Sequence, residues 1–321
     1  MINRWRGKAL LWLWRHHRHL PDRIAHKIFK ALNKAGCAPD FAFRHQFFGM
    51  HYDGNLTNNV DAAIYFYGAF EKPLLCFMGD ALSAVSDGHG VFVDVGANVG
   101  QHSLYMSRFA TQVLAFEPYE PVRLRLEHQL SLNAINNVAV HALGLSDANT
   151  KQIFFAPTGN NAGIGSFDPE STNKGNIAIG ELALVRGDDF FGNQKPERLD
   201  LIKIDVEGFE KAVLHGLQQT LLRYRPLLIV EMTYGGTLSF KSSNEISSVL
   251  PPDYLLLCFD KRRADGRKRQ RHNARARSSG LYQLIPYPGP LASGQDDVIL
   301  CPQELYQQIP LTNCKKNNNK N

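Results

Sequence analysis

The chain has 321 residues, 44% of them hydrophobic, and a formal net charge of +6. This length and composition exclude a fibrous or low-complexity protein and suit one main globular domain with a substantial core. The five cysteines contain no C-x-x-C pair, which argues against a disulfide framework or a zinc knuckle and favours a reducing compartment.

The basic residues are concentrated in two segments. Residues 1–34 and 261–277 each hold nine Lys and Arg against one acid, so each carries +8 and the remainder of the chain carries −10. An acidic body argues against a nucleic-acid-binding surface spread over the whole fold. The basic segments still leave room for local contact with anionic lipid or nucleic acid.

The first 34 residues interleave Trp, Leu and Ile with Arg, Lys and His, which predicts one or two basic amphipathic helices broken near Pro21. Such a helix either lies in a membrane interface or, more commonly, packs its apolar stripe on the body of the protein. The apolar run within residues 8–19 is too short for a membrane span, and no signal-peptide cleavage site follows it. We therefore expect a cytoplasmic protein, with contact at the inner face of the membrane as an alternative.

After an aromatic-rich lead-in, the chain alternates apolar strands with helical stretches, which predicts a doubly wound, mostly parallel sheet. Helices are expected at Pro121–Asn133 and Phe209–Arg223. The predicted strands are Val91–Val95, Val113–Phe116, Val138–Ala142, Leu199–Asp205 and Leu227–Glu231.

Two departures from this alternation are expected. Gln152–Phe155 and Leu182–Arg186 look like strands that flank a polar, glycine-rich loop, so we place them in an insertion near the site that could act as a lid. Tyr254–Phe259 and Asp297–Cys301 should form an antiparallel hairpin at the end of the sheet, with the second basic run in its connection.

The stretch VFVDVGANVG (91–100) is an apolar strand that enters a glycine turn at the start of a helix. Gly96 and Gly100 permit a sharp turn and a close approach, and Asn98 tolerates a left-handed backbone. The free N–H groups of the following helix would face an anion. Glu117, 21 residues after Gly96, is placed to bind a ribose. Together these features predict a site for a nucleoside-containing cofactor.

The turn G-A-N-V-G lacks the third spaced glycine of the dinucleotide motif G-x-G-x-x-G. It suits the methionine carboxylate of S-adenosylmethionine (SAM) better than the pyrophosphate of NAD. SAM is therefore the expected cofactor.

A family resemblance rests on FVDVGANVGQHSLYMS, AFEP, GLSD, LIKIDVEGFEKAVLHGL and RPLLIVEM, which follow one another at similar spacings between about Val91 and Met232. In these motifs the chain resembles the FkbM family of SAM-dependent methyltransferases. The resemblance implies a Rossmann-like fold and methyl transfer to oxygen. It implies a methionine-binding turn at Asp94, Gly96, Ala97, Asn98 and Gly100, a ribose ligand at Glu117, and adenine contacts at Ser146 and Asp147.

Asp205 and Glu207 emerge at the end of a buried strand, which is where ligands sit in open α/β sheets. A carboxylate there could remove the proton of an acceptor hydroxyl, so we expect Asp205 to be the base and Glu207 to orient the acceptor. In a structural alternative, Lys203 pairs with one of these acids or Glu207 holds a turn with Gly208. His102 is a competing base. A divalent metal held with Glu231 is possible but not favoured.

We predict a SAM-dependent methyltransferase acting on a hydroxyl of a glycan, glycolipid or secondary metabolite. The alternatives are an N-methyltransferase or a non-catalytic nucleic-acid-binding protein on the same fold. The predicted organisation is a basic, aromatic-rich lead-in at 1–85, the methyltransferase domain at 86–310 and a polar tail at 311–321. Within the domain, the insertion is at 151–190 and the basic loop at 261–280.

Overall fold

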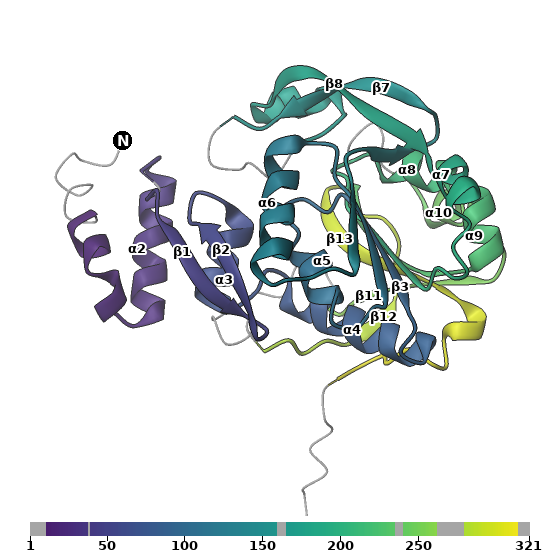
Figure 1. Cartoon of the computed structure of the whole chain (residues 1–321), viewed down its shortest axis with the longest axis horizontal. Helices are drawn as coiled ribbons and strands as arrows, with labels where there is room; N and C mark the ends of the chain where they lie inside the picture. The colour runs from purple at the N-terminus through teal and green to yellow at the C-terminus, as the bar shows by residue number, and fades with distance from the viewer. Residues whose placement is uncertain (1–10, 38, 159–164, 235–239, 262–278, 314–321) are drawn as a thin grey trace, which may run out of the picture.

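The computed structural model describes residues 11–37, 39–158, 165–234, 240–261 and 279–313 (Figure 1). Its core is a sheet in which eight strands follow the order β12-β11-β13-β10-β9-β3-β4-β5. These strands are β3 (Val91–Val95), β4 (Gln112–Phe116), β5 (Val138–His141), β9 (Leu201–Ile204), β10 (Leu227–Tyr234), β11 (Tyr254–Phe259), β12 (Leu284–Pro286) and β13 (Gly294–Pro302).

The pairing confirms the predicted mostly parallel α/β sheet. Strands β10, β9, β3, β4 and β5 run parallel to one another, with Val93 opposite both Leu114 and Ile202. The predicted antiparallel hairpin is present as β11 and β13, and β13 pairs in turn with β10. Its connection also holds β12, a short strand that the sequence did not predict and that adds to β11. The basic run in that connection lies at 262–278, outside the described residues.

Helices cover both faces of the sheet, because the apolar strands must be buried on both sides. One face is covered by α4 (Lys72–Ser86), α5 (Gln101–Met106) and α6 (Glu120–Leu132). The other is covered by α7 (Gly187–Gln194), α8 (Glu210–Gly216), α9 (Gln218–Tyr224) and α10 (Ser243–Ser248). A 3-10 turn, η3 (Gln303–Leu305), follows β13.

The single helix predicted at Phe209–Arg223 is instead the pair α8 and α9, which meet at Leu217. The reason is a close backbone contact. A Cβ atom on Gly216 would lie 1.8 Å from the carbonyl oxygen of Ser146, so the end of α8 is pressed against the strand that carries Ser146. The break lets the chain turn while Leu217 stays fully buried.

The predicted insertion forms a separate three-stranded sheet in the order β6-β8-β7, at the top of Figure 1. Its elements are β6 (Gly144–Ser146), β7 (Thr150–Ala156), the 3-10 helix η2 (Pro169–Lys174) and β8 (Ile177–Arg186). Part of the glycine-rich loop, 159–164, lies outside the described residues. That this insertion moves as a lid stays a prediction.

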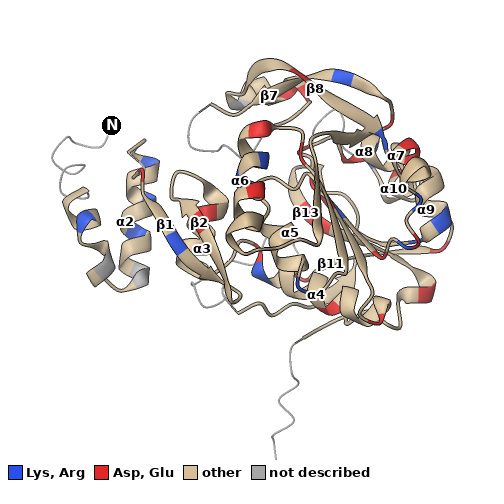
Figure 2. Cartoon of the chain, in the orientation of Figure 1, with Lys and Arg blue, Asp and Glu red and all other residues tan. Residues whose placement is uncertain are grey.

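The N-terminal layer consists of a helical stretch at 11–15, η1 (His17–His19), α2 (Asp22–Lys34), β1 (Ala42–Phe47), β2 (Met50–Asn55) and α3 (Asn59–Tyr67). The break at Pro21 is confirmed, and Lys and Arg lie along α2 (blue in Figure 2). The apolar stripe of α2, which includes Ile28, Phe29 and Leu32, packs with Trp14 and Ala62.

This packing accounts for much of the apolar surface of the N-terminal layer, although Trp12 and Ile24 stay exposed. Of the residues that suggested the amphipathic pattern, Trp5 and Leu10 lie outside the described part of the chain. Across the described residues, none of the helices is both long and apolar enough to cross a bilayer. Peripheral contact with an anionic membrane stays a prediction.

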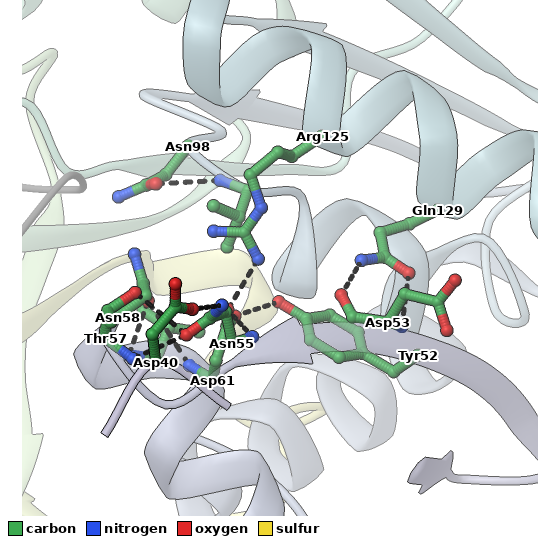
Figure 3. Close-up of polar contacts among 12 residues, drawn as sticks. Asp40, Tyr52, Asp53, Asn55, Thr57, Asn58, Asp61, Asn98, Arg125 and Gln129 are labelled. Carbon is green, nitrogen blue, oxygen red and sulfur yellow. Dashed lines mark hydrogen bonds and ion pairs between the residues drawn. The ribbon is translucent and has the colours of Figure 1, made fainter. Parts of the chain in front are cut away.

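A buried ion pair joins the N-terminal layer to the main domain (Figure 3). Asp61 of α3 is fully buried, and one of its carboxylate oxygens lies 2.6 Å from a guanidinium nitrogen of Arg125 on α6. Asp61 also accepts hydrogen bonds from the Tyr52 hydroxyl and the Asn55 amide. Next to it, the Gln129 side chain both donates to and accepts from the backbone of Asp53. These contacts set the position of α3 relative to α6.

Removing the cation of this pair should destabilise the protein. We expect Arg125→Met to lower the free energy of unfolding by about 3 kcal/mol, because it leaves the Asp61 carboxylate buried without its partner. Denaturant unfolding measures the change. Arg44→Met is the matched control, since Arg44 is exposed in its pair with Asp53, and it should lower the free energy of unfolding much less. Equal losses in the two variants would contradict the role given to Asp61.

Candidate active site

A cavity of about 270 Å³ opens at the carboxyl ends of β3, β4, β9 and β10. This is the edge of a parallel sheet at which ligands bind. The structure brings six of the predicted residues to its lining: Gly96, Ala97, Asn98, Glu117, Asp205 and Glu207. The predicted insertion contributes as well, through Phe154, Gly165, Ser166 and Phe167.

The turn after β3 has the left-handed backbone that its residues predicted. Gly96, Asn98 and Gly100 have φ values of 82°, 52° and 85°. A Cβ atom on Gly96 would lie 1.9 Å from the carbonyl oxygen of Asp205, and one on Gly100 would lie 2.2 Å from Leu126. Both glycines are therefore required by protein contacts. The first brings the Asp205 loop against the turn, and the second lets α6 pack on it.

Glu117 directly follows β4 and is 7% exposed. Its two carboxylate oxygens accept hydrogen bonds of 2.8 Å from the backbone amides of Asn98 and Tyr119. Burial raises the pKa of Glu117 to about 7, although these two amides lower it. A carboxylate held in this way retains lone pairs that can accept hydrogen bonds from a ligand's hydroxyl groups.

Asp94 does not line the cavity but lies fully buried beneath it in β3. Its Oδ2 atom accepts a 2.6 Å hydrogen bond from the Ser103 hydroxyl, which ties β3 to the first turn of α5. Its Oδ1 atom is buried without a hydrogen-bond partner among the described residues. Burial raises the pKa of Asp94, and the charge of Lys203 opposes this effect.

Ser146 and Asp147 are also outside the lining of the cavity, as are Asp94 and Gly100. Ser146 is buried in β6, where its backbone meets Gly216, and its hydroxyl donates to Asp147. Their contact with adenine stays a prediction. The aromatic side of the cavity is formed by other residues, among them Tyr119, Phe154 and Phe167.

Lys203 lies at the centre of the sheet with only 2% of its side chain exposed. Its Nζ atom donates a 2.8 Å hydrogen bond to Asp205 Oδ2, so the predicted pairing of Lys203 with one of the acids is confirmed. Burial lowers the pKa of Lys203, but the charges of Asp205 and Asp94 outweigh burial and raise it above its usual range. Lys203 is thus a fixed positive charge beneath the cavity.

Glu207 and Glu231 stand beside Asp205, and oxygens of the three carboxylates lie within 4.8 Å of one another. The Gln295 amide of β13 donates to both glutamates, at 3.3 Å and 3.4 Å. Burial, together with the negative charge of Asp205, raises the pKa of Glu231 well above its usual range. The arrangement has the oxygen donors and spacing that a divalent cation would require, so Asp205, Glu207 and Glu231 are the residues that could hold a metal.

Glu71, which the sequence analysis did not identify, forms an acidic cluster with Glu231 and Asp297. It has a left-handed backbone, with φ 47°, at the start of α4. Its carboxylate lies within 4.8 Å of those of Glu231 and Asp297. Burial, followed by the charge of Asp297, raises the pKa of Glu71 to about 7. The strained backbone of a non-glycine residue at this point is typical of functional sites.

The other proposed role of Glu207, holding a turn with Gly208, belongs instead to Glu210. The Glu210 carboxylate accepts a 2.9 Å hydrogen bond from the Gly208 amide. Glu207 and Gly208 both have left-handed backbones, with φ 51° and 98°, so the loop needs this support. Glu210 thereby leaves the side chain of Glu207 to line the cavity.

His102, the competing base, lines the cavity and is 8% exposed. Its Nε2 atom is buried without a hydrogen-bond partner among the described residues. Burial, helped by the positive charge of Lys203, keeps the pKa of His102 well below its usual range. The ring is therefore neutral at physiological pH, and its Nε2 atom can donate or accept a hydrogen bond according to the tautomer.

The N-terminal layer also contributes to the cavity, which local sequence reasoning did not foresee. Asn58, Asn59 and Phe70 line it. The buried side chain of Gln101 accepts a 2.6 Å hydrogen bond from the Phe70 amide and donates to the Phe70 carbonyl at 3.2 Å. The only available sequence signal was the position of Gln101 directly after the glycine turn.

Comparison with known proteins agrees with this geometry. Residues 94–251 match the family described as the methyltransferase FkbM domain. This part of the chain belongs to the FkbM methyltransferase family. The resemblance predicted from the motifs is thereby confirmed.

The curated relatives share only part of their length with this chain. The methyltransferase sdnD of Sordaria araneosa is 34% identical over 157 residues, which cover 40% of this chain and 60% of the relative. The AMB antimetabolite synthetase AmbE of Pseudomonas aeruginosa is 32% identical over 176 residues, which cover 44% of this chain and 8% of the synthetase. A solved methyltransferase FkbM from Methylobacillus flagellatus is 17% identical, with a TM-score of 0.39, and the match covers 66% of this chain and 44% of that one.

The buried carboxyl of Glu210 should make stability depend on pH. Burial raises its pKa from an ordinary 4.5 to about 7, so the stabilising contribution of the protonated form is complete below pH 4.5 and is lost as the pH rises through 7. Glu210→Gln keeps an acceptor for the Gly208 amide but removes this titration. Between pH 4.5 and pH 8 we expect the free energy of unfolding to fall by roughly 3 kcal/mol more in the wild type than in the variant.

Denaturant unfolding at a series of pH values measures this difference. The exposed Glu181, changed to Gln, is the control and should follow the wild type. Parallel pH profiles for wild type and Glu210→Gln would show that the Glu210 carboxyl does not carry the effect.

Proposed function

We propose that this FkbM-family chain is a SAM-dependent O-methyltransferase that acts on a hydroxyl of a glycan, glycolipid or secondary metabolite. The observation that supports the proposal is that two kinds of side chain and backbone group line one cavity. A glycine turn with a buried carboxylate, Glu117, is on one side, and the Asp205, Glu207 and Glu231 carboxylates are on the other.

The residues on the first side fit SAM. The Glu117 carboxylate suits the two hydroxyl groups of a ribose. The backbone of Gly96, Ala97 and Asn98 borders the same space, where no long side chain intervenes. Tyr119, Phe154 and Phe167 offer an apolar, aromatic surface for adenine. We propose this aromatic surface as the principal adenine contact, with Ser146 and Asp147 outside the lining.

SAM, when bound, supplies a methyl group already activated by a positively charged sulfur. The protein's own task is then to position the acceptor and to take its proton. Asp205 is the proposed base. Lys203 holds one of its oxygens, so the carboxylate keeps a fixed orientation while it is 24% exposed towards the cavity. Glu207, held by Gln295, orients the acceptor.

Glu117 should make SAM binding depend on pH. Because the pKa of Glu117 is about 7 and its ionised form accepts ribose hydrogen bonds better, affinity should rise about tenfold between pH 6 and pH 8. In Glu117→Gln we expect weaker binding and a flatter pH profile. Calorimetric titration with SAM measures both. Comparison with the wild type separates Glu117 from the titration of SAM itself, and an equal pH dependence in both proteins would reject the ribose assignment.

Asp205 should matter for turnover more than for cofactor affinity. We expect Asp205→Asn to reduce kcat at least about a hundredfold and to leave the Kd of SAM within a few fold. S-adenosylhomocysteine formation is measured with an alcohol that the wild type accepts from a hydroxylated panel. If Asp205→Asn stays active and His102→Phe does not, the base is His102, whose Nε2 atom is available.

The same assay separates two further alternatives. Turnover that disappears with EDTA and returns with Mg²⁺ would place a cation among Asp205, Glu207 and Glu231. The carboxylates would also attract a protonated amine, so primary amines belong in the panel. A product methylated on nitrogen would replace the O-methyltransferase assignment.

A further inference from the structure

A second and larger cavity, of about 580 Å³, lies beside the first. It is formed by α2, α3, the turn into α4 and the segments next to β11 and β12. All of its described lining residues fall at 26–73 and 259–283, outside the part of the chain that matches the FkbM family. The family domain thus carries the predicted cofactor-binding end, and segments outside the matched part of the chain form the second cavity.

The two cavities are adjacent. Asn59 and Phe70 line both. Glu71 lines the second cavity, and its carboxylate lies within 4.8 Å of that of Glu231, which lines the first. A molecule in the second cavity can therefore present one end to the carboxylates at which methyl transfer is proposed.

The walls of the second cavity are largely aromatic. Phe29, Phe66 and Phe70 line it from the N-terminal layer, and Phe259 and Tyr282 line it from the other side. The rings of Phe29 and Phe66 are 5.3 Å apart, and Tyr67 is held by hydrogen bonds between its hydroxyl and His26. Such walls favour a molecule with an apolar, ring-containing body.

Both acidic and basic side chains line the second cavity. The acid Glu71 stands at the end that meets the first cavity. Lys30 and Lys72 also line the second cavity, and neither ammonium makes an ion pair with a carboxylate of the described residues. Lys72 lies over the Phe48 ring, 5.3 Å from its centre. Lys261, by contrast, is already paired with Asp297. Two cations without a carboxylate partner among the described residues suit an anionic substituent, although Asp260 also lines this cavity.

We propose that the second cavity binds the body of the methyl acceptor, and that the acceptor is an amphiphilic alcohol with an apolar, ring-containing body and an anionic group. Its hydroxyl reaches Asp205 and Glu231, and its anionic group lies near Lys30 and Lys72. This assignment rests on the proposed methyltransferase function and narrows its substrate class. It favours a secondary metabolite over an unmodified neutral glycan, which has neither the apolar body nor the anionic group.

The binding test uses a dye of the proposed chemistry. The probe 1-anilinonaphthalene-8-sulfonate has aromatic rings and one anionic group, and N-phenyl-1-naphthylamine has the same rings without the sulfonate. Fluorescence titrations give the Kd of each, with and without saturating S-adenosylhomocysteine. We expect both dyes to bind in the presence of S-adenosylhomocysteine, the sulfonate more tightly.

Two variants locate the binding site. Ala63→Trp fills the second cavity, because Ala63 lines it from α3, and should weaken both dyes at least tenfold. Ala84→Trp, on an exposed position of α4, is the matched control. Replacing Lys30 and Lys72 together by Gln should weaken only the sulfonate, about fivefold. The control replaces the exposed Lys151 and Lys195 by Gln.

The catalytic readout links the second cavity to the acceptor. With an accepted alcohol, the sulfonate should inhibit competitively against that alcohol and not against SAM, and Ala63→Trp should raise the KM of the alcohol while leaving the Kd of SAM unchanged. Dye binding that Ala63→Trp does not alter, or inhibition competitive with SAM, overturns the inference. A protein that binds the dyes as expected but shows no SAM binding by calorimetry would instead overturn the proposed function, so the two failures are distinguishable.

Discussion

The buried ammonium of Lys203 is the interaction on which the site depends. It lies in the middle of the parallel sheet, donates to Asp205 and is close enough to Asp94 for each charge to shift the pKa of the other group. Without this cation, the carboxylates of Asp94 and Asp205 would repel each other with no positive charge to oppose the repulsion. The same charge helps to keep His102 neutral. A single lysine therefore holds one proposed base, Asp205, in place and adds to the effect of burial on the other, His102.

A second set of contacts decides what can reach that site. The Asp61–Arg125 pair fixes α3 against α6, and the Gln101 side chain holds the backbone of Phe70 against the glycine turn. Both contacts join segments that are more than 30 residues apart. Because Phe70 and Glu71 are held there, the first and second cavities meet at the acidic cluster. The contacts of the N-terminal layer thus define the second half of the site.

Much of the fold followed from local pattern. The run Val91–Val95 is β3 with the predicted bounds. The two apolar segments predicted to form a hairpin are the antiparallel strands β11 and β13. Asn98 has the left-handed backbone its side chain tolerates. Prediction was wrong where a distant contact decided the outcome. The helix expected at Phe209–Arg223 divides because Gly216 meets the backbone of Ser146, about 70 residues earlier in the chain.

The sequence by itself determined the parallel sheet, the glycine turn with Glu117, the acids Asp205 and Glu207, and the family, because each of these depends on residues close together in the chain. Only the tertiary structure decided that Glu71 and Asp297 join Glu231 in one acidic cluster, that Glu210 supports the Glu207 loop, and that the backbone of Ser146 packs against Gly216 of α8. The physical reason is that burial and charge–charge contacts act between segments that no local pattern relates.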